Sequence, residues 1–260
     1  MIKKCEAIVL RSIDYRDQSK ILTLYTKEFG RISAIAKGCR SPQSKYASAF
    51  EVGSHINAVL YKKSTREVQN ISDASVKTAF LGITASLEKL SAMHQIVELI
   101  RLATEDEEMQ PKIFALLAET LWRVDQSKRN IGNFFFYFQV KLVTLLGFKP
   151  SFEECVLSGK NIWKELESAD EKLLALLPEH GGIALRREAE LRGLSGRAIS
   201  IQAVRLIQLL ASSAMDDLEN LRLQDGVAGE IAQILDTYFR FHIEDLPPLR
   251  SREVFNQLTQ

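Results

Sequence analysis

Two stretches close together, Lys20–Thr26 (KILTLYT) and Arg31–Lys37 (RISAIAK), decide the fold of the first part of this chain. Both are short and rich in β-branched or aromatic residues, a composition that favours strands. In the second stretch Ile32, Ala34 and Ala36 fall on one face, because side chains alternate along a strand. Each stretch therefore predicts a strand with one buried face.

Three further stretches of the same kind bring the number of predicted strands to five. Turn residues separate them, at Asp14–Ser19, at Glu28–Gly30 and in the loop Gly38–Ser44 (GCRSPQS). Five short strands are too few for a sandwich and suit a small closed barrel of the oligonucleotide/oligosaccharide-binding (OB) type. The added strands are Cys5–Arg11, His55–Tyr61 and Glu67–Ile71.

After about residue 80 the apolar spacing becomes helical, with Leu87, Leu90, Met93, Val97 and Ile100 three or four residues apart. We expect an α+β multidomain chain: an OB-type domain over residues 1–80 and a mainly helical domain over 81–260, with an irregular insertion at about 151–197. The Phe-rich helix beginning near Phe134 is expected at the buried centre of a bundle. Predicted helices cover Ile83–Thr104, Pro111–Asp125, Asn130 or Asn133 to Gly147, Ala169–Leu177, Ser200–Ser212, Gly226–Glu244 and Leu249–Leu258.

The net charge of +1 conceals an asymmetry along the chain. Residues 1–80 carry 14 of the 34 Lys and Arg but only 7 of the 33 Asp and Glu, a net of +7; the remaining residues have a net of −6. A basic module joined to a mildly acidic one suggests a polyanion as the partner of the first.

Membrane, secretion and disulfide signals are missing from the sequence. The most apolar stretch, Phe134–Phe148, is too short for a membrane span and contains Lys141. The first residues lead directly into a strand pattern without an apolar signal core. Cys5, Cys39 and Cys155 lie far apart in sequence, which fits a reducing cytoplasm.

No catalytic motif is present, and no cofactor is expected. A phosphate-binding loop, a nucleophile elbow and a zinc-protease motif are all missing, and the four histidines are scattered. Asp216, Asp217 and Glu219 leave one alternative open, a metal-dependent nuclease or strand-transfer enzyme. Acidic residues at the start of a helix more often stabilise the helix by interacting with its dipole. We therefore expect a protein that is not an enzyme.

The cations of the first module cluster at strand ends and loops, where they could follow the phosphates of a single strand. Tyr15 and Tyr46, in polar loops, are the aromatic residues expected to stack on bases, whereas Phe29 and Phe50 are expected in the core. An RNA-binding OB protein would share these electrostatics and stays an alternative. The candidate cations are Arg11, Arg16, Arg31, Lys37, Arg40, Lys45, Lys62, Lys63 and Arg66.

Several segments resemble the pattern of RecO, a family of bacterial DNA-repair proteins. In the first module they are Glu6–Arg11 (EAIVLR), Asp14–Asp17 (DYRD), Leu24–Gly30 (LYTKEFG) and Ala36–Arg40 (AKGCR). The resemblance continues through the helical half and covers nearly the whole chain. There it rests on Glu98-Leu99, Leu145–Pro150 (LLGFKP), Arg240–His242 and Leu249–Ser251.

The resemblance implies a cytoplasmic, nucleoid-associated recombination mediator. Such a protein binds single- and double-stranded DNA and anneals complementary strands. It engages RecR and the C-terminal tail of single-stranded-DNA-binding protein (SSB), and with RecR it helps load RecA onto SSB-coated gaps. Further cations of the helical half are expected to extend the DNA surface: Arg123, Lys128, Arg129, Arg186 and Arg187.

Many members of that family carry a four-cysteine zinc site, which this sequence does not keep. Cys155 is the only thiol left, and Leu185 and Glu188, beside Gly181-Gly182, take matching positions. One thiolate and one carboxylate do not close a tetrahedral structural site, so we predict no zinc.

Overall fold

The computed structural model describes residues 1–41, 43–44, 46, 48–169 and 171–258. The chain forms two compact units, one of Met1–Ser127 with Pro248–Gln260 and one of Lys128–Pro247. The predicted domain boundary near residue 80 falls inside the first unit and stays a prediction.

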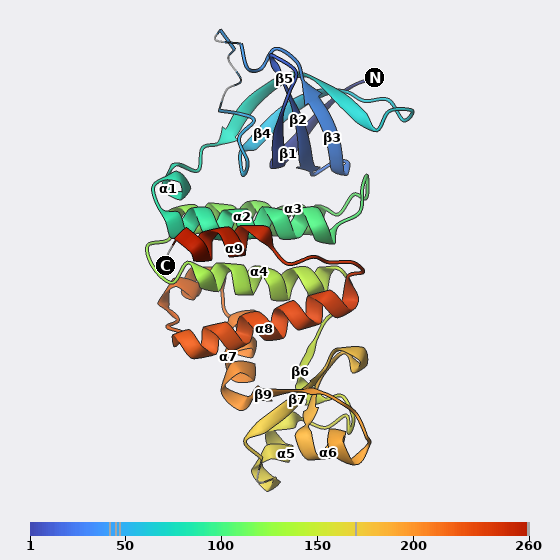
Figure 1. Ribbon diagram of the computed structural model, residues 1–260, viewed down its shortest axis with the longest axis vertical. Coiled ribbons are helices and arrows are strands. Elements are labelled where there is room, and N and C mark those ends of the chain that lie inside the picture. The colour runs from blue at the N-terminus through green and yellow to red at the C-terminus, as the bar shows by residue number, and fades with distance from the viewer. Residues whose placement is uncertain (42, 45, 47, 170, 259–260) are drawn as a thin grey trace. The chain divides into compact units, whose positions relative to one another are not determined.

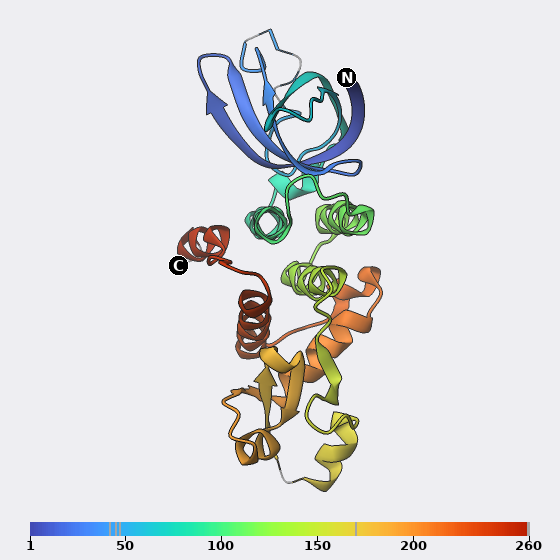
Figure 2. The ribbon, with the colours of Figure 1, turned by 90° about the vertical axis from the view of Figure 1, so that its right-hand side faces the viewer.

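The first unit begins with the predicted five-stranded barrel. Its strand order is β1-β2-β3-β5-β4, with β4 pairing back onto β1 so that the sheet closes, as Figure 2 shows. All neighbours are antiparallel except β3 and β5, which run parallel. The strands are β1 (Ile2–Tyr15), β2 (Ser19–Thr26), β3 (Gly30–Ala36), β4 (His55–Tyr61) and β5 (Val68–Thr78).

Alternation along the strands fills the barrel interior. The predicted inner face of β3, Ile32, Ala34 and Ala36, is buried there, and so is Phe50. Phe29 is half-buried and packs against this core. β1 and β5 are longer than predicted. β1 is extended because its first half pairs with β4 and its second half pairs with β2. β5 is extended because its polar end pairs with β4.

Helices pack on the outside of the barrel within this unit. Tyr25 of β2 is fully buried and its ring stacks on Phe114 of α3 at 6.5 Å between centroids. The predicted helix Ile83–Thr104 is divided at Ser86, whose side chain accepts a hydrogen bond from Lys89 N and begins α2. Figure 1 shows the helices: α1 (Leu81–Thr84), α2 (Leu87–Ala103), α3 (Pro111–Gln126) and the C-terminal α9 (Arg250–Leu258).

The second unit contains a helical layer and a small sheet. Phe134, Phe135 and Phe138 of α4 are buried, as expected for the central helix, which contacts α7 and α8. The other 3-10 and α-helices are α5 (Ile162–Ser168), η1 (Pro178–His180), α6 (Arg186–Leu191) and η2 (Met215–Asn220). The helical layer consists of α4 (Gly132–Leu145), α7 (Ile201–Ser212) and α8 (Asp225–His242).

The predicted helix over Ala169–Leu177 is wrong. Leu173–Leu177 forms a strand, β7, the inner strand of a four-stranded sheet of order β6-β8-β7-β9. An apolar run this short does not distinguish a buried strand from a buried helix turn, and pairing on both edges decides for the strand. Its partners are β6 (Ser151–Cys155), β8 (Gly182–Leu185) and β9 (Arg197–Ser200).

None of the helices in the described part of the chain combines the length and apolar character that a membrane crossing requires.

Candidate nucleic-acid interface

Two loops of the barrel are joined by the side chain of Arg40. Its Nη2 lies 3.0 Å from Oδ2 of Asp14, and its Nη1 donates to the carbonyls of Arg16 (3.2 Å) and Asp17 (3.4 Å). Lys37 follows β3 in the same region and is exposed without an ion pair among the described residues. We call Tyr15, Arg16, Lys37 and Arg40 the loop cluster.

Tyr15 and Arg16 present a ring and a cation together at the β1–β2 turn. Arg16 takes a left-handed backbone conformation (φ 53°), and its guanidinium carbon lies 5.2 Å from the centroid of the Tyr15 ring. Tyr15 is 36% exposed, so one face of the ring remains available. This is the kind of surface on which a base can stack beside a phosphate-binding cation.

Tyr46 is placed differently from Tyr15. Its hydroxyl donates to Oδ1 of Asp73 at 2.8 Å, and its ring packs 5.8 Å from that of Phe50 in the barrel core. These contacts hold Tyr46 half-buried, so it offers less stacking surface than its polar sequence context suggested. Lys45, predicted beside it, lies outside the described residues.

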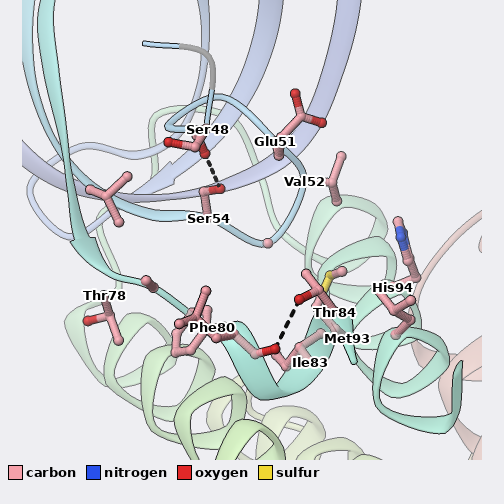
Figure 3. Close-up of a pocket in the computed structure, with 15 residues that line it drawn as sticks. Ser48, Glu51, Val52, Ser54, Thr78, Phe80, Ile83, Thr84, Met93 and His94 are labelled. Atoms are coloured by element: carbon pink, nitrogen blue, oxygen red, sulfur yellow. Dashed lines mark hydrogen bonds between the residues drawn. The ribbon is translucent and has the colours of Figure 1, made fainter. Parts of the chain in front are cut away.

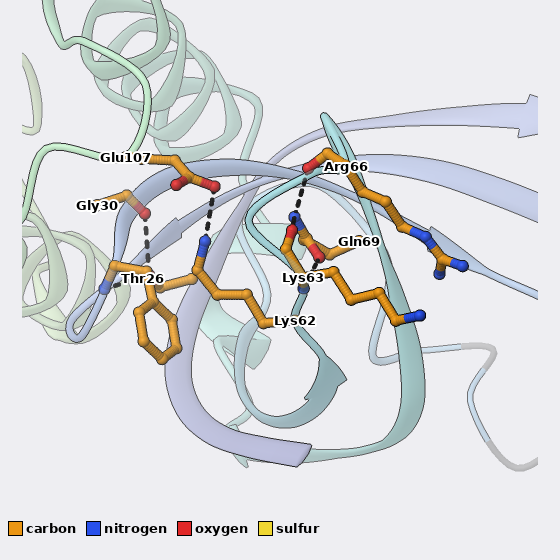
Figure 4. A network of polar contacts seen from close by, with 8 residues as sticks. Thr26, Gly30, Lys62, Lys63, Arg66, Gln69 and Glu107 are labelled. Atoms are coloured by element: carbon orange, nitrogen blue, oxygen red, sulfur yellow. Dashed lines mark hydrogen bonds and ion pairs between the residues drawn. The ribbon is translucent and has the colours of Figure 1, made fainter. Parts of the chain in front are cut away.

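A second group of cations lies at the β4–β5 turn (Figure 4). Gln69, fully buried, accepts from Lys63 N at 2.9 Å and donates to the carbonyls of Lys63 at 3.0 Å and Arg66 at 2.6 Å. The side chains of Lys63 and Arg66 extend into solvent. Lys62 is engaged instead: its Nζ lies 2.6 Å from Oε1 of Glu107 and 5.6 Å from the Phe29 ring centroid.

Strand direction separates these two groups. β3 runs parallel to β1 and β4 runs antiparallel to it, so the residues after β3 and those after β4 lie at opposite ends of the barrel. Arg16, Lys37 and Arg40 therefore share one end, and Lys62, Lys63 and Arg66 share the other. Sequence reasoning treated all of them as one cluster at strand ends and loops, because it did not assign strand directions.

Arg31 is occupied by contacts inside the first unit. Its Nε donates to Oδ1 of Asp106 at 2.7 Å and its Nη1 donates to the carbonyl of Arg101, while its own carbonyl accepts from Glu107 N at 2.8 Å. The acidic loop between α2 and α3 thus holds Arg31. Arg11, by contrast, is exposed on β1.

The remaining predicted cations belong to helices. In the first unit Arg123 lies on α3, with its guanidinium 4.8 Å from the Trp122 ring centroid. In the second unit Lys128 and Arg129 precede α4; Lys128 N donates to Glu219 and the Arg129 side chain donates to Asn220. Arg186 and Arg187, both exposed, begin α6, and Arg186 pairs with Glu190 at 2.8 Å.

The alternative metal site at Asp216, Asp217 and Glu219 is not assembled. Asp216 and Asp217 lie in the first turn of η2, and Glu219 accepts a hydrogen bond from the backbone of Lys128. Within the part of the chain that the structure describes, a group of three potential metal ligands occurs at a different place, at Cys155, Glu165 and Glu188.

That group does not fit a four-thiolate zinc site. The buried Cys155 thiol donates to Oε2 of Glu188 at 3.5 Å, and Glu188 also pairs with Arg192 at 2.8 Å. The retained thiol, Cys155, and one of the two positions predicted to match missing thiols, Glu188, are thus brought together. A single thiol already engaged by a carboxylate lacks the donor set of a structural zinc site.

An apolar pocket of about 610 Å³ opens beneath the loop Ser48–Ser54, next to Phe80 and α2 (Figure 3). Gly53 has φ +85°, and a Cβ there would lie 2.7 Å from the Met93 sulfur, so glycine is required for this close approach. Its described lining contains no Lys or Arg, and the pocket is therefore not a phosphate site.

The class of protein follows from these features. A closed five-stranded barrel with exposed cations at its loops, and without a catalytic constellation among the described residues, is typical of nucleic-acid-binding proteins. Two family models match the chain, "Recombination protein O N terminal" over residues 1–80 and "Recombination protein O C terminal" over residues 85–253.

Similar proteins cover the chain almost from end to end. A "DNA repair protein RecO" of Chloroherpeton thalassium is 50% identical over 99% of both chains. Proteins of the same description from Chlorobium limicola and Prosthecochloris aestuarii are 35% and 32% identical, each over at least 98% of both chains. The chain belongs to the RecO family of DNA repair proteins, which are recombination mediators and not enzymes.

Proposed function

We propose that this protein binds single- and double-stranded DNA and anneals complementary strands. Together with RecR it would help load RecA onto SSB-coated single strands during recombinational gap repair, in the cytoplasm and at the nucleoid. The observation that carries the proposal is the loop cluster, an exposed aromatic ring among cations on a barrel of a RecO family chain.

The proposed mechanism is charge neutralisation combined with stacking. Cations of the loop cluster bind the phosphates of two strands and reduce their repulsion, so that complementary bases can pair. Tyr15 offers its ring to one base at a time. Neither step needs nucleotide hydrolysis, in agreement with the missing phosphate-binding loop. RecR and the acidic SSB tail are proposed as partners of the protein.

The test is an annealing assay on SSB-coated complementary strands. The variant Lys37→Ala/Arg40→Ala/Lys45→Ala removes two cations of the loop cluster together with Lys45, which lies outside the described residues, and we expect it to lose most annealing. A control with the same loss of charge replaces Lys149, Lys160 and Lys172, exposed lysines of the second unit. Equal activity of the two variants would contradict the proposal.

The salt dependence of DNA affinity gives a second readout. Each phosphate-contacting cation replaced by Ala should reduce the slope of log K against log salt by about one. A salt-independent affinity would refute charge neutralisation. Competition between DNA and RNA of the same sequence separates the proposal from an RNA-binding role, because an RNA-binding protein should bind the RNA more tightly.

A further inference from the structure

A pocket of about 420 Å³ lies between β1, α2 and the C-terminal helix α9, all in the first unit. Three arginines from three distant parts of the chain line it: Arg11 of β1, Arg101 at the end of α2 and Arg250 at the start of α9. Arg101 and Arg250 were not predicted as functional residues, because 149 positions separate them in sequence.

Local structure explains how these residues meet. The pairing of β1 with β2 shifts register between Val9 and Arg11, so Leu10 is an extra residue of a β-bulge. Leu10, Arg11 and Ser12 all line the pocket as a result. Without the bulge, regular alternation would turn Arg11 into the barrel after Cys5, Ala7 and Val9, and with the bulge Arg11 lies on the outside instead.

Glu98 attaches α9 to the pocket. Its carboxylate accepts from the backbone of Arg250 at 3.2 Å, the backbone of Ser251 at 2.9 Å and the hydroxyl of Ser251 at 2.6 Å. These bonds cap the first turn of α9 and place Arg250 at the pocket. Glu98 thus satisfies two of the orphan N–H groups of α9, and this capping does not use the side chain of Arg250.

The charges of the pocket do not cancel. Three guanidinium groups face one carboxylate, which lies 3.8 Å from Arg101. His94 also lines the pocket, and burial lowers its pKa, so it is neutral at pH 7. Burial lowers the pKa of Arg101 as well; Glu98 opposes this shift and the cations Arg11, Arg31 and Arg250 add to it. An excess of two positive charges at one place favours a bound anion.

We propose that Arg11, Arg101 and Arg250 form a binding site for one backbone phosphate of DNA, so that the C-terminal helix is part of the DNA-binding surface. This proposal rests on the proposed function. The planar guanidinium groups suit bidentate binding of phosphate oxygens. Arg11 and Arg250 are exposed, and a long polymer can therefore reach them.

The position of the pocket fits a continuous path for one strand. Arg11 precedes Tyr15 by four residues on β1, a separation of about 13 Å along a strand. A single OB barrel covers about 4–16 nucleotides, enough to join the pocket to the loop cluster. An acidic peptide would use the same charges but would not need this continuity, and we favour DNA for that reason.

The experiment measures the affinity of full-length protein for labelled single-stranded DNA across a salt series. Arg11→Ala and Arg250→Ala should each weaken binding by about tenfold at low salt and reduce the salt slope by about one. Arg250→Lys should keep the slope, since lysine binds phosphate as a point charge. Arg252→Ala, two residues further along α9, is the matched control and should leave the slope unchanged.

A direct ligand readout uses inorganic phosphate. About 100 mM phosphate should raise the Tm of the unmodified protein above that in sodium chloride of the same ionic strength, because a ligand of the native state stabilises it. The Arg11→Ala/Arg250→Ala variant should lose this increase, and its circular dichroism spectrum checks that it folds.

The outcomes distinguish this proposal from the proposed function. Suppose that Arg250→Ala keeps the salt slope of DNA binding unchanged while Lys37→Ala/Arg40→Ala reduces it. The phosphate site is then wrong, and the DNA-binding barrel stands. If neither variant changes the slope, the proposed function fails too. If Arg250→Ala lost binding to an acidic peptide but kept its DNA binding, the pocket would belong to a protein partner, and the phosphate assignment would be overturned.

Discussion

The Nε atom of Arg31 donates to Oδ1 of Asp106 over 2.7 Å, although 75 positions separate the two residues. This ion pair and the pair of Lys62 with Glu107 attach the acidic α2–α3 loop to one end of the barrel. The loop therefore occupies two cations that could otherwise contact DNA.

Replacing Asp106 by Asn and Glu107 by Gln should release Arg31 and Lys62. We expect DNA affinity to rise by about three- to tenfold at low salt and little at high salt. Stability should change by about 1 kcal/mol or less, since both carboxylates are largely exposed. Fluorescence anisotropy measures the affinity. Glu105→Gln, an exposed neighbour, is the control, and an equal rise in that variant would show that general charge repulsion is responsible.

Gln69 supports the turn that presents Lys63 and Arg66. Gln69→Leu removes three hydrogen bonds from a fully buried side chain, at a cost of about 2–3 kcal/mol in the free energy of unfolding. Urea unfolding measures this cost. We also expect weaker DNA binding at a temperature where the variant is folded, because the turn loosens. Asn70→Leu is the neighbouring control, and an equal loss of stability there would contradict the role of Gln69.

Tyr15 and Tyr46 should respond differently to mutation. Tyr15→Ala should weaken single-stranded DNA binding by about 1–3 kcal/mol, the value of one stacked base, and Tyr15→Phe should not. Tyr46→Phe removes the hydrogen bond to Asp73 and should cost about 1 kcal/mol of stability with DNA affinity unchanged. Equilibrium titration and thermal unfolding separate the two effects. If Tyr15→Ala binds normally, stacking at this position is wrong.

His55 should make stability depend on pH. Burial lowers its pKa below 6.5, against the opposing effect of Glu6, whose Oε1 lies 2.9 Å from its Nε2. As pH falls below about 6.5 the unfolded state takes up a proton that the folded state resists, so stability is lost on acidification and is complete above that pH. His94 and His242 contribute in the same direction.

Thermal unfolding between pH 8 and 4 tests this, with His55→Gln for comparison. The difference in Tm between the unmodified protein and His55→Gln should change progressively as pH falls below 6.5. Burial raises the pKa of Glu6, but the larger combined effect of Lys77 and His55 lowers this pKa below 4.5. A second loss of stability is therefore expected below pH 4.5. Parallel curves for the two proteins above pH 5 would contradict the role of His55.

Purified protein should contain no tightly bound zinc, because Cys155 is already hydrogen-bonded to Glu188. A chelator should leave the Tm unchanged. Cys155→Ser, which keeps a donor at this position, should fold with a small loss of stability, and Cys155→Ala should lose about 1 kcal/mol more. Elemental analysis that finds one zinc per chain would contradict this.

Much of the fold was predictable from local patterns. The alternation in Arg31–Lys37 and the helical spacing after residue 80 reflect which face each segment buries, and the structure confirms both. The sheet of the second unit was missed. Leu173–Leu177 is too short to show a period, and its strand conformation depends on two partners distant in sequence.

The sequence by itself determined the basic first module, the barrel strands with their inner residues, and the likeness to RecO. Each of these depends on residue type and short-range order. Only the tertiary structure decided which cations share an end of the barrel, which are held by the acidic loop, and that Arg11, Arg101 and Arg250 line one pocket. Such groupings depend on strand direction, a β-bulge and the return of the C-terminal helix, contacts between residues that are far apart in the chain.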